Sequence, residues 1–432
     1  MTFPLPTSPL HHRRLAGGKG APEWAALPED RAEEEDEADW SEEEDEGGSG
    51  YAEPAAPSAS ASAATSARRR IERSTAPVAL ESGALAPGRL SIRRVKDANA
   101  KEPARGVVTS VQFHPTGALV MVGSLDKTLR FFEADGQRNR KLASVHFPDM
   151  PVMDARLGGD GLTAFAVGRR PHYYTYDIPS ATPTRIPALQ GRGDRSLESF
   201  AVSPVAGAPV LAFLVGDGDV VLASTATRQP VGVMRASSAA RAAAFTPDGS
   251  SLLTACDDGL VHVWDVRTQR LRGRFEDEGM QAASSLAVSP GGDTIAVGSD
   301  AGIVNIYGTA DVEAAMAGFA DGPRGRPGAP SGPFRRAVTV APRKVLTQIT
   351  TRISGVTFNH DGSILAMASH TVADRLRLVH TGTMTAFGNW PTARTPLGYV
   401  RAAAFSPTGD RLAVGNDKGR VLLLRMPFFD DK

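Results

Sequence analysis

The sequence is poor in cysteine and in long apolar runs, and each shortage excludes a class of protein. Its single cysteine, Cys256, excludes a disulfide framework, a cysteine-based zinc site and an iron–sulfur cluster. No stretch approaches the roughly 18 uninterrupted apolar residues that a membrane-spanning helix needs. The N-terminus, MTFPLPTSPLHHRR, lacks the apolar core of a signal peptide. We therefore expect a soluble, intracellular protein without a membrane partner.

The chain also lacks net charge, because 48 Lys and Arg residues balance 48 Asp and Glu residues. This balance is a cancellation between two unlike parts of the chain. Residues 1–100 carry 18 acidic and 12 basic side chains, whereas residues 101–432 carry 30 acidic and 36 basic side chains. The counts exclude a uniformly basic nucleic-acid-binding protein and predict an acidic front followed by a mildly basic remainder.

Residues 1–87 contain few of the side chains that build a core. Ala, Ser, Pro, Gly and Glu dominate this segment, so little apolar surface is available to offset the entropy lost when the backbone is ordered. We expect a disordered, acidic, low-complexity tail over residues 1–87. Its acidic block, residues 33–37 and 42–46, is either a solvating segment or a docking tail for a basic partner.

Two features of this tail are candidate sites. Ser41 is followed by three glutamates, which is the pattern of an acceptor for an acidophilic kinase, although such matches also arise by chance. A basic cluster further along could contact RNA phosphates or serve as a nuclear-import patch. This cluster consists of Arg68, Arg69, Arg70 and Arg73.

From residue 106 onward a repeat with a period near 43–47 residues dominates the chain. Each unit opens with a short apolar strand and a turn, continues with a second apolar strand, and reaches a third strand through a turn that often contains Asp and Gly. β-branched and aromatic residues fill these strands. The seven openings lie at residues 110–117, 153–161, 199–207, 242–249, 285–293, 355–362 and 402–409.

Three strands and a variable outer strand at this period predict a single seven-bladed β-propeller of the WD-repeat kind over residues 88–432. Only Trp264-Asp265 carries the eponymous dipeptide. The last repeat has no residues for a fourth strand, and an open edge would promote association between chains. We therefore expect residues 90–95 to supply the closing strand.

One insertion interrupts the period, because the turns of the fifth and sixth repeats are about 70 residues apart. The excess falls in residues 310–336, whose Gly, Pro and Arg content predicts a flexible loop. This loop is either a basic arm that contacts RNA or a tolerated surface insertion.

The sequence contains no catalytic or phosphate-binding motif, which favours an interaction protein over an enzyme. Phosphate-loop, dinucleotide-binding, HExxH and GxSxG patterns are all missing. We interpret His262 as a structural residue and Cys256 as a small buried hydrophobe. We expect no cofactor, metal or small-molecule substrate. An enzyme with ionisable residues converging on the central face stays an alternative.

Five strings in the repeats contain sequences that are unusual for WD repeats in general, among them FEDEG, GIVNIY and RLRLVH. These strings resemble the U3 small nucleolar RNA-associated protein 18 family, a WD-repeat subunit of the small-subunit processome. The resemblance covers about residues 89–426 and is most specific in FEDEG, GIVNIY and RLRLVH. A second element, KGAPEWAALPED at residues 19–30, is similar to one that precedes the acidic run in that family. The strings lie at residues 111–137, 261–279, 295–307, 365–380 and 412–426.

The resemblance implies a non-enzymatic scaffold in the nucleus and nucleolus, within the UTP-B subcomplex. The implied partners are the other UTP-B WD-repeat subunits, the U3 snoRNP and the pre-rRNA particle, in processing toward 18S rRNA. Members of the family can carry an N-terminal motif that recruits the exosome's helicase, and Thr2-Phe3-Pro4 does not match it. Either the chain starts downstream of that motif or the recruitment function is missing. A substrate receptor of a ubiquitin ligase is the alternative function.

Overall fold

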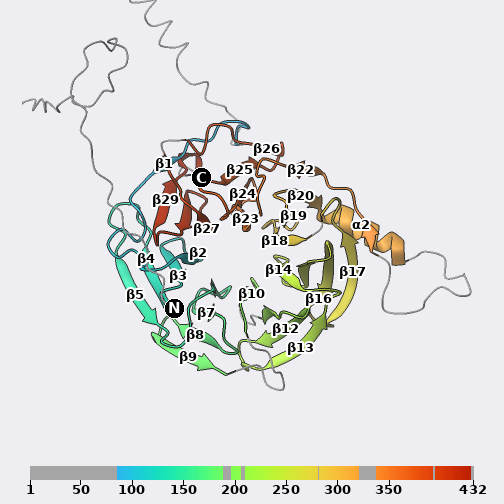
Figure 1. Ribbon diagram of the computed structural model, residues 1–432, viewed down its shortest axis with the longest axis horizontal. Helices are drawn as coiled ribbons and strands as arrows, with labels where there is room; N and C mark the ends of the chain where they lie inside the picture. The colour runs from blue at the N-terminus through green and yellow to red at the C-terminus, as the bar shows by residue number, and fades with distance from the viewer. Residues whose placement is uncertain are drawn as a thin grey trace, which may run out of the picture. The chain divides into compact units, whose positions relative to one another are not determined.

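The computed structural model describes residues 85–429, apart from residues 188–195, 206–209, 281, 321–336 and 393–394. Within these residues the chain forms seven small sheets that are arranged as blades around a central axis (Figure 1). The first strand of each blade lies nearest the axis, and the following strands lie farther out (Figure 1). The predicted seven-bladed β-propeller is confirmed.

The first three blades each contain four antiparallel strands in chain order. The second of them, whose opening turn lacks proline, forms as regular a sheet as the others. The strands are β2 (Val108–Phe113), β3 (Leu119–Ser124), β4 (Thr128–Glu133) and β5 (Lys141–His146); β6 (Asp154–Leu157), β7 (Thr163–Val167), β8 (Tyr173–Asp177) and β9 (Thr182–Ile186); β10 (Ser199–Val202), β11 (Val210–Leu214), β12 (Asp219–Ser224) and β13 (Pro230–Arg235).

The remaining four blades depart from chain order at three places: blade four gains a fifth strand, blade five receives its outer strand after an insertion, and blade seven receives its outer strand from the front of the chain. The strands of blades four and five are β14 (Ala240–Phe245), β15 (Ser251–Cys256), β16 (Leu260–Asp265), β17 (Arg270–Glu276) and β21 (Val338–Thr339); β18 (Ala283–Val288), β19 (Thr294–Ser299), β20 (Val304–Gly308) and β22 (Lys344–Leu346). Those of blades six and seven are β23 (Gly355–Phe358), β24 (Ile364–Ala368), β25 (Leu376–His380) and β26 (Thr385–Ala386); β27 (Val400–Phe405), β28 (Arg411–Asn416), β29 (Val421–Arg425) and β1 (Arg93–Arg94), with a 3-10 turn, η2 (Pro427–Phe429), after β29.

Burial changes from the axis to the rim, and this explains the sequence pattern of each strand. The second strands are buried on both faces, as in β15, because each blade packs between two neighbours. They are therefore continuous apolar runs rather than alternating ones. The outer strands β5 and β13 alternate between exposed and partly buried residues, since only one of their faces meets a neighbouring blade.

The apolar core lies between blades rather than in one central cluster. Blades one and two, for example, share a cluster in which Phe131 stacks on Tyr176 at 5.5 Å between ring centroids and Phe147 stacks on Tyr174 at 4.5 Å. Offset ring pairs of this kind add stabilisation beyond the area that they bury. The ring is therefore held together by contacts between successive blades.

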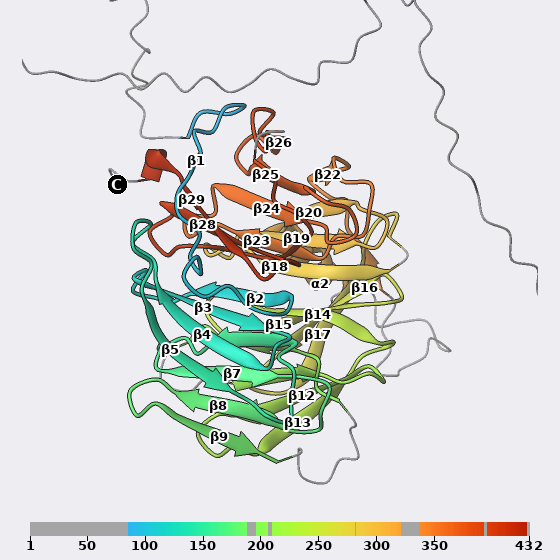
Figure 2. The ribbon, with the colours of Figure 1, turned by 60° about the vertical axis from the view of Figure 1, so that its left-hand side comes forward.

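The ring closes through pairing of β1 with β29, which lie side by side in Figures 1 and 2. Arg93 pairs with Arg425 and Arg94 with Leu424, and the pairing is shorter than the expected strand over residues 90–95. Before β1, Leu85 and Leu90 are buried in the cluster shared by blades six and seven. Leu85 belongs to the segment expected to be tail, so packing against the propeller begins before residue 88.

The prediction of a flexible loop over residues 310–336 is wrong for its first part. Residues 309–320 form α2 (Thr309–Ala320), which lies outside β17 in Figure 1. Residues 321–336 lie outside the described residues, and β21 follows them and adds a parallel strand to β17. Because the insertion starts from blade five and reaches blade four, it links the outer edges of two blades.

Two contacts explain why a helix forms there. Val312 is buried in the cluster shared by blades four and five, so α2 has an apolar side to cover. Gly273 of β17 leaves space for Met316, since a Cβ atom at Gly273 would lie 2.5 Å from the Met316 sulfur. Arg343 and Asp311 form an ion pair at 2.7 Å, which fixes the first turn of the helix to the segment before β22.

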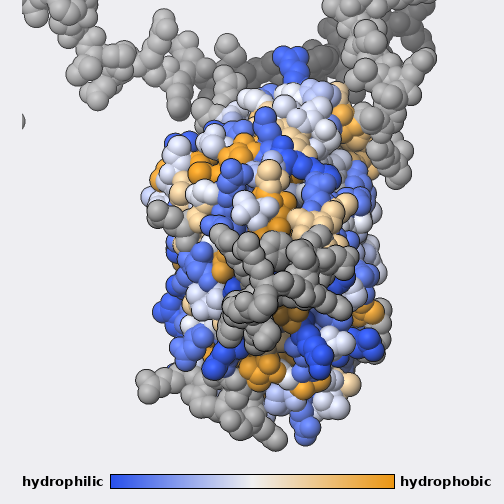
Figure 3. Space-filling model, turned by 90° about the vertical axis from the view of Figure 1, so that its right-hand side faces the viewer, coloured by the Kyte–Doolittle hydropathy of each residue, from blue (hydrophilic) through white to orange (hydrophobic). Residues whose placement is uncertain are grey.

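The outer side of the ring near α2 is mostly hydrophilic, with small separate apolar areas (Figure 3). This surface is typical of a folded domain, in which isolated apolar side chains at the surface are ordinary. Among the described residues, no helix is long and apolar enough to span a bilayer.

Candidate interaction face

The first strands of the seven blades enclose a central cavity of about 510 Å³. Small residues line most of its wall, and a few long polar side chains interrupt them. One of these, Gln112, accepts a hydrogen bond at 2.8 Å from the main-chain N–H of Leu157 and so joins blades one and two. The charged residues of the wall are Asp154, Arg156, Glu198, Arg241 and Arg401.

Two of these arginines occupy the same position in different blades. The pentapeptide RAAAF occurs at residues 241–245 in β14 and at residues 401–405 in β27, so Arg241 and Arg401 are each the second residue of an inner strand. Both lie at the rim of the cavity on the face where the second strand of each blade turns into the third. We call this face the upper face. Sequence reasoning missed these arginines, although the repeated pentapeptide was a signal for them.

An alternating row of charges runs along the upper face over blades four to six. Arg241 forms two hydrogen bonds of 2.7 Å with Asp257, and Arg352 forms an ion pair of 3.1 Å with Asp300. Hydrogen bonds from Arg241 hold the pKa of Asp257 below its ordinary value, and the nearby Arg352 adds to this effect. The two acidic residues lie in the turns between the second and third strands of blades four and five, and Asp257 positions Arg241 at the cavity rim.

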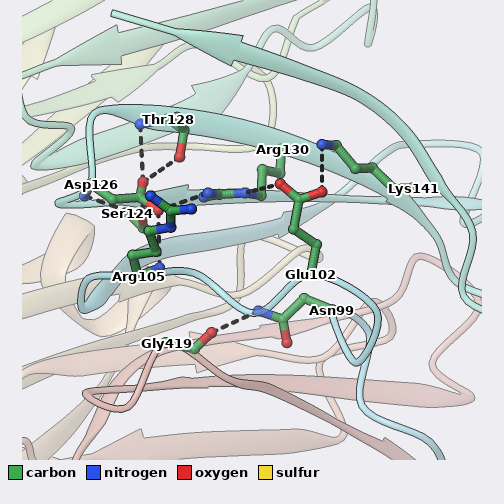
Figure 4. A network of polar contacts seen from close by, with 9 residues as sticks. All are labelled: Asn99, Glu102, Arg105, Ser124, Asp126, Thr128, Arg130, Lys141 and Gly419. Atoms are coloured by element: carbon green, nitrogen blue, oxygen red, sulfur yellow. Dashed lines mark hydrogen bonds and ion pairs between the residues drawn. The ribbon is translucent and has the colours of Figure 1, made fainter. Parts of the chain in front are cut away.

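A second polar network lies on the upper face where the ring closes (Figure 4). Arg130 is almost fully buried between two carboxylates, with Asp126 at 2.8 Å and Glu102 at 3.5 Å. Asp126 also accepts hydrogen bonds from the side chains of Ser124 and Thr128 and from the main-chain N–H of Arg105 at 3.2 Å. The segment that follows β1 is thereby bound to blade one.

The same segment is bound to blade seven by Asn99 (Figure 4). Its Nδ2 donates to the Gly419 carbonyl at 2.7 Å, and its Oδ1 accepts from the Val421 N–H at 2.9 Å. Asn99 is buried, so both hydrogen bonds are shielded from water. Closure of the ring thus depends on side chains as well as on the short strand β1.

Cys256 and His262 lie in contact but are not a nucleophilic pair. Burial raises the pKa of the Cys256 thiol to about 12 and lowers the pKa of His262 to about 4, so both groups are neutral near pH 7. Ser237 donates to Asp258 and lies 3.3 Å from His262 Nε2. A Ser-His-Asp triad places histidine between the other two residues, whereas here serine occupies the middle.

This arrangement supports the structural interpretation of both residues. The Ser237 hydroxyl donates its hydrogen bond to Asp258, so the Ser237 oxygen accepts one from the N–H of His262 Nε2. His262 Nδ1 is then unprotonated and accepts a hydrogen bond from the Cys256 thiol at 3.5 Å. Trp264, beside His262 in β16, donates from Nε1 to Thr254 at 2.9 Å. These hydrogen bonds satisfy polar groups inside blade four, and nothing in them activates a nucleophile.

A buried carboxyl group lies between blades four and five. Asp277 accepts hydrogen bonds at Oδ1 from the Tyr307 hydroxyl and from Asn305 Nδ2, the latter at 2.8 Å, while its Oδ2 has no partner among the described residues. Burial raises the pKa of Asp277 to about 6, against the lowering effect of the two hydrogen bonds. No basic side chain is paired with this carboxylate in the described part of the chain.

We expect Asp277→Asn to preserve or raise stability at pH 7. An aspartate whose pKa is higher in the folded than in the unfolded state loses its stabilising proton as pH rises from about 4 to 6, so the wild type becomes less stable across this window. The amide keeps an oxygen acceptor and removes the charge, which is worth up to about 3 kcal/mol at pH 7. Melting temperatures at pH 4.5 and 7.5 test this prediction. The melting temperature of the variant minus that of the wild type should be larger at pH 7.5 than at pH 4.5. A variant that is less stable at both values by the same amount contradicts it.

The site residues predicted from the sequence lie in a part of the chain that the structure does not describe, so they stay predictions. Ser41, Arg68, Arg69, Arg70 and Arg73 lie outside the described residues, as does the acidic block at residues 33–46. Within the described ranges, no group of three or more His, Cys, Asp or Glu residues is arranged to hold a metal ion. Among the described residues, the polar groups that lie together are the ion pairs of Arg241 and Arg352 on the upper face and the contacts of Arg130 and Asn99 where the ring closes.

Comparison with known proteins identifies the repeats and shows which proteins the chain is similar to. The family model of the WD domain, G-beta repeat, matches residues 101–133 and 228–265. The chain is 35% identical over 347 residues to the U3 small nucleolar RNA-associated protein 18 homolog of Arabidopsis thaliana, covering 80% of this chain and 59% of the relative. It is 31% identical over 350 residues to the probable U3 small nucleolar RNA-associated protein 18 of Schizosaccharomyces pombe, covering 80% of this chain and 62% of the relative.

A mouse homolog with the same name is 29% identical over 352 residues, covering 81% of this chain and 59% of the relative. The chain thus spans about three fifths of the length of these relatives. The similarity extends over about four fifths of the chain, far beyond the two segments matched by the WD-repeat model, so it is not confined to generic blade residues. Over about four fifths of its length the chain is therefore similar to proteins named U3 small nucleolar RNA-associated protein 18.

Proposed function

We propose that this protein is a non-enzymatic scaffold subunit of the small-subunit processome that acts in nucleolar processing of pre-rRNA toward 18S rRNA. The observation that carries the proposal is the similarity over about 80% of the chain to proteins named for their association with the U3 small nucleolar RNA. The proposed partners are the other WD-repeat subunits of UTP-B, the U3 snoRNP and the pre-rRNA particle. The proposed domain organisation is an acidic tail over residues 1–87 that precedes the propeller.

The physical properties of the propeller suit a scaffold. Its cores lie between successive blades, so the upper face, the lower face and the outer edges stay available for different partners. The polar groups described above are held in ion pairs or in buried hydrogen bonds, which rigidifies the faces that partners would contact. A rigid surface loses little conformational entropy when it binds.

Conditional depletion in cells that depend on this protein tests the function. We expect unprocessed precursors of 18S rRNA to accumulate and mature 18S rRNA to fall, while RNAs of the 60S lineage stay largely intact. Northern hybridisation with one probe for each lineage measures both effects in the same samples. The physical reason is that loss of a platform that holds several partners stalls assembly of the whole particle.

Re-expression of the full chain is the control, and it should restore the 18S lineage. Sedimentation of the tagged protein provides a second measurement, since a processome subunit should migrate with large RNA-containing particles. Unchanged 18S precursors after complete depletion would contradict the proposal. Co-purification with a single ubiquitin-ligase adaptor in place of such particles would favour the substrate-receptor alternative.

A further inference from the structure

Three large apolar side chains are exposed on the upper face over blades six, seven and one. They are Val372, Tyr399 and Leu125, which are 38%, 43% and 38% exposed. Each lies in a loop or turn at the upper end of its blade. Single exposed apolar residues are ordinary, so the question is whether these three lie on one continuous surface.

Main-chain hydrogen bonds join the loops that carry these side chains to one another. The Asp374 N–H donates to the Gly398 carbonyl at 2.9 Å, which joins the loop of Val372 to the loop of Tyr399. The Asp417 N–H donates to the Tyr399 carbonyl at 3.2 Å, which continues the surface to the turn between β28 and β29.

From that turn the surface continues to blade one. The Ala104 N–H donates to the Gly419 carbonyl at 2.9 Å, and the Leu125 N–H donates to the Val107 carbonyl at 3.0 Å. The three apolar residues therefore lie along one connected arc, which we call the upper-rim patch. The patch also includes two cations, Arg401 and Lys418.

The charge of the patch is unbalanced. Arg401 and Lys418 are exposed and form no ion pair with a described residue. The neighbouring acidic side chains are engaged by the main chain instead, since Asp374 accepts from the N–H groups of Leu397 and Gly398, and Asp417 accepts from that of Tyr399. The pKa of His370 is lowered by burial and next by the nearby Arg401 and Arg352, which indicates a positive potential at this rim.

We propose that the upper-rim patch binds an extended acidic peptide of a partner protein that carries a large apolar side chain. Its carboxylates pair with Arg401 and Lys418, and its apolar side chain packs against Tyr399 and Val372. Arg401 also lines the central cavity, so one acidic side chain of the peptide can enter the mouth of that cavity. The inference is independent of the processome proposal, because it concerns the chemistry of the surface alone.

A peptide fits these residues better than RNA does. Proteins that bind single-stranded RNA present several aromatic rings for stacking of successive bases, whereas the patch has one exposed aromatic side chain beside two aliphatic ones. Arginine and tyrosine, both present in the patch, are among the residue types that dominate the binding energy of protein–protein contacts.

Selection of peptides on the full chain tests the proposal. A displayed library of random 12-residue peptides is panned against the protein, and the recovered peptides are synthesised with a fluorescent label and measured by polarisation. We expect them to be net acidic with at least one large apolar residue. Arg401→Glu and Tyr399→Ser should each weaken binding at least tenfold. Higher salt should weaken binding to the wild type, because the charged contacts are exposed.

Two matched variants on the opposite face provide the control. Arg138→Glu reverses an exposed charge and Leu162→Ser removes an exposed apolar side chain, both at lower turns, so neither should change the affinity. Failure to recover peptides, recovery of peptides that are not acidic, or equal binding by all four variants would overturn the proposal. Binding of a 20-residue oligouridylate that is lost in Arg401→Glu, without acidic peptides, would assign the patch to RNA instead.

Discussion

Removal of residues 1–97 is expected to lower the melting temperature by about 5–10 °C, whereas removal of residues 1–84 should leave it unchanged. The longer deletion removes β1, the Val95 N–H that donates to the Leu423 carbonyl at 3.0 Å, and buried Leu90. Loss of a buried leucine alone typically costs about 2–5 kcal/mol. The longer deletion also removes the two hydrogen bonds between the Asn389 side chain and the main chain of Leu90.

The deletion should also change the state of association. Without β1, the outer edge of β29 exposes unpaired main-chain groups, which are a template for pairing between chains. Light scattering during the melting experiment is expected to show association of the longer deletion only. Equal melting temperatures for the two deletions would remove the closing role of β1.

A point variant tests the same closure without shortening the chain. Asn99→Ala breaks the hydrogen bonds to Gly419 and Val421 and leaves the Val421 N–H buried without a partner, at a cost of about 1–3 kcal/mol. The Gly419 carbonyl keeps the hydrogen bond from the Ala104 N–H. Lys101→Ala, two residues further on at an exposed position, is the matched control and should melt with the wild type.

Much of the fold could be predicted because every blade repeats one local pattern. The turn after each first strand and the buried second strand recur at a fixed period, so seven weak signals reinforce one another. Burial on both faces produces continuous apolar runs such as SLLTAC in β15, which are visible without any knowledge of the ring. The absence of residues for a fourth strand in the last repeat pointed to the front of the chain.

The first part of the insertion was predicted wrongly because the Gly, Pro and Arg content of residues 310–336 was averaged over the whole segment. Gly, Pro and Arg fill residues 321–336, but TADVEAAM before them contains good helix formers with Asp311 in the first turn. A separate assessment of the two halves predicts the helix. The parallel pairing of β21 with β17 could not be predicted, because it depends on where α2 returns the chain in space.

The polar sites could not be predicted for a related reason. Arg130 and Glu102 are 28 residues apart, and Asn99 and Gly419 are 320 residues apart, so their contacts exist only when the ring is closed. The upper-rim patch likewise combines loops of three blades, each of which carries one unremarkable apolar residue. Only the repeated RAAAF pentapeptide placed two rim residues in register by sequence alone.

Asp126→Ala is expected to destabilise the protein by about 3–5 kcal/mol, because it leaves the guanidinium of Arg130 buried without its nearest counter-charge. Glu102 lies farther away, at 3.5 Å, and is shared with Lys141, so it does not replace Asp126. The double variant Asp126→Ala/Arg130→Met removes the charge as well as its partner. It should recover part of the loss, since a buried ion pair replaced by apolar side chains is often nearly neutral.

The pH dependence separates this role from simple loss of packing. Burial raises the pKa of Asp126, but hydrogen bonds from Arg130, Ser124 and Thr128 outweigh burial, so the net pKa lies well below its ordinary value. A carboxyl group with a lowered pKa in the folded state contributes stability that is present above about pH 4 and is lost as the pH falls further. Asp126→Asn should therefore differ most from the wild type near neutral pH, and the difference should shrink on acidification. Asp277→Asn should change stability in the opposite direction near neutral pH, because the pKa of Asp277 is raised in the folded state and its charge is destabilising there. Melting curves of both variants from pH 3 to pH 8 decide the matter: an Asp126→Asn deficit that does not shrink below pH 4 would show that the carboxylate charge is not what holds Arg130 in place.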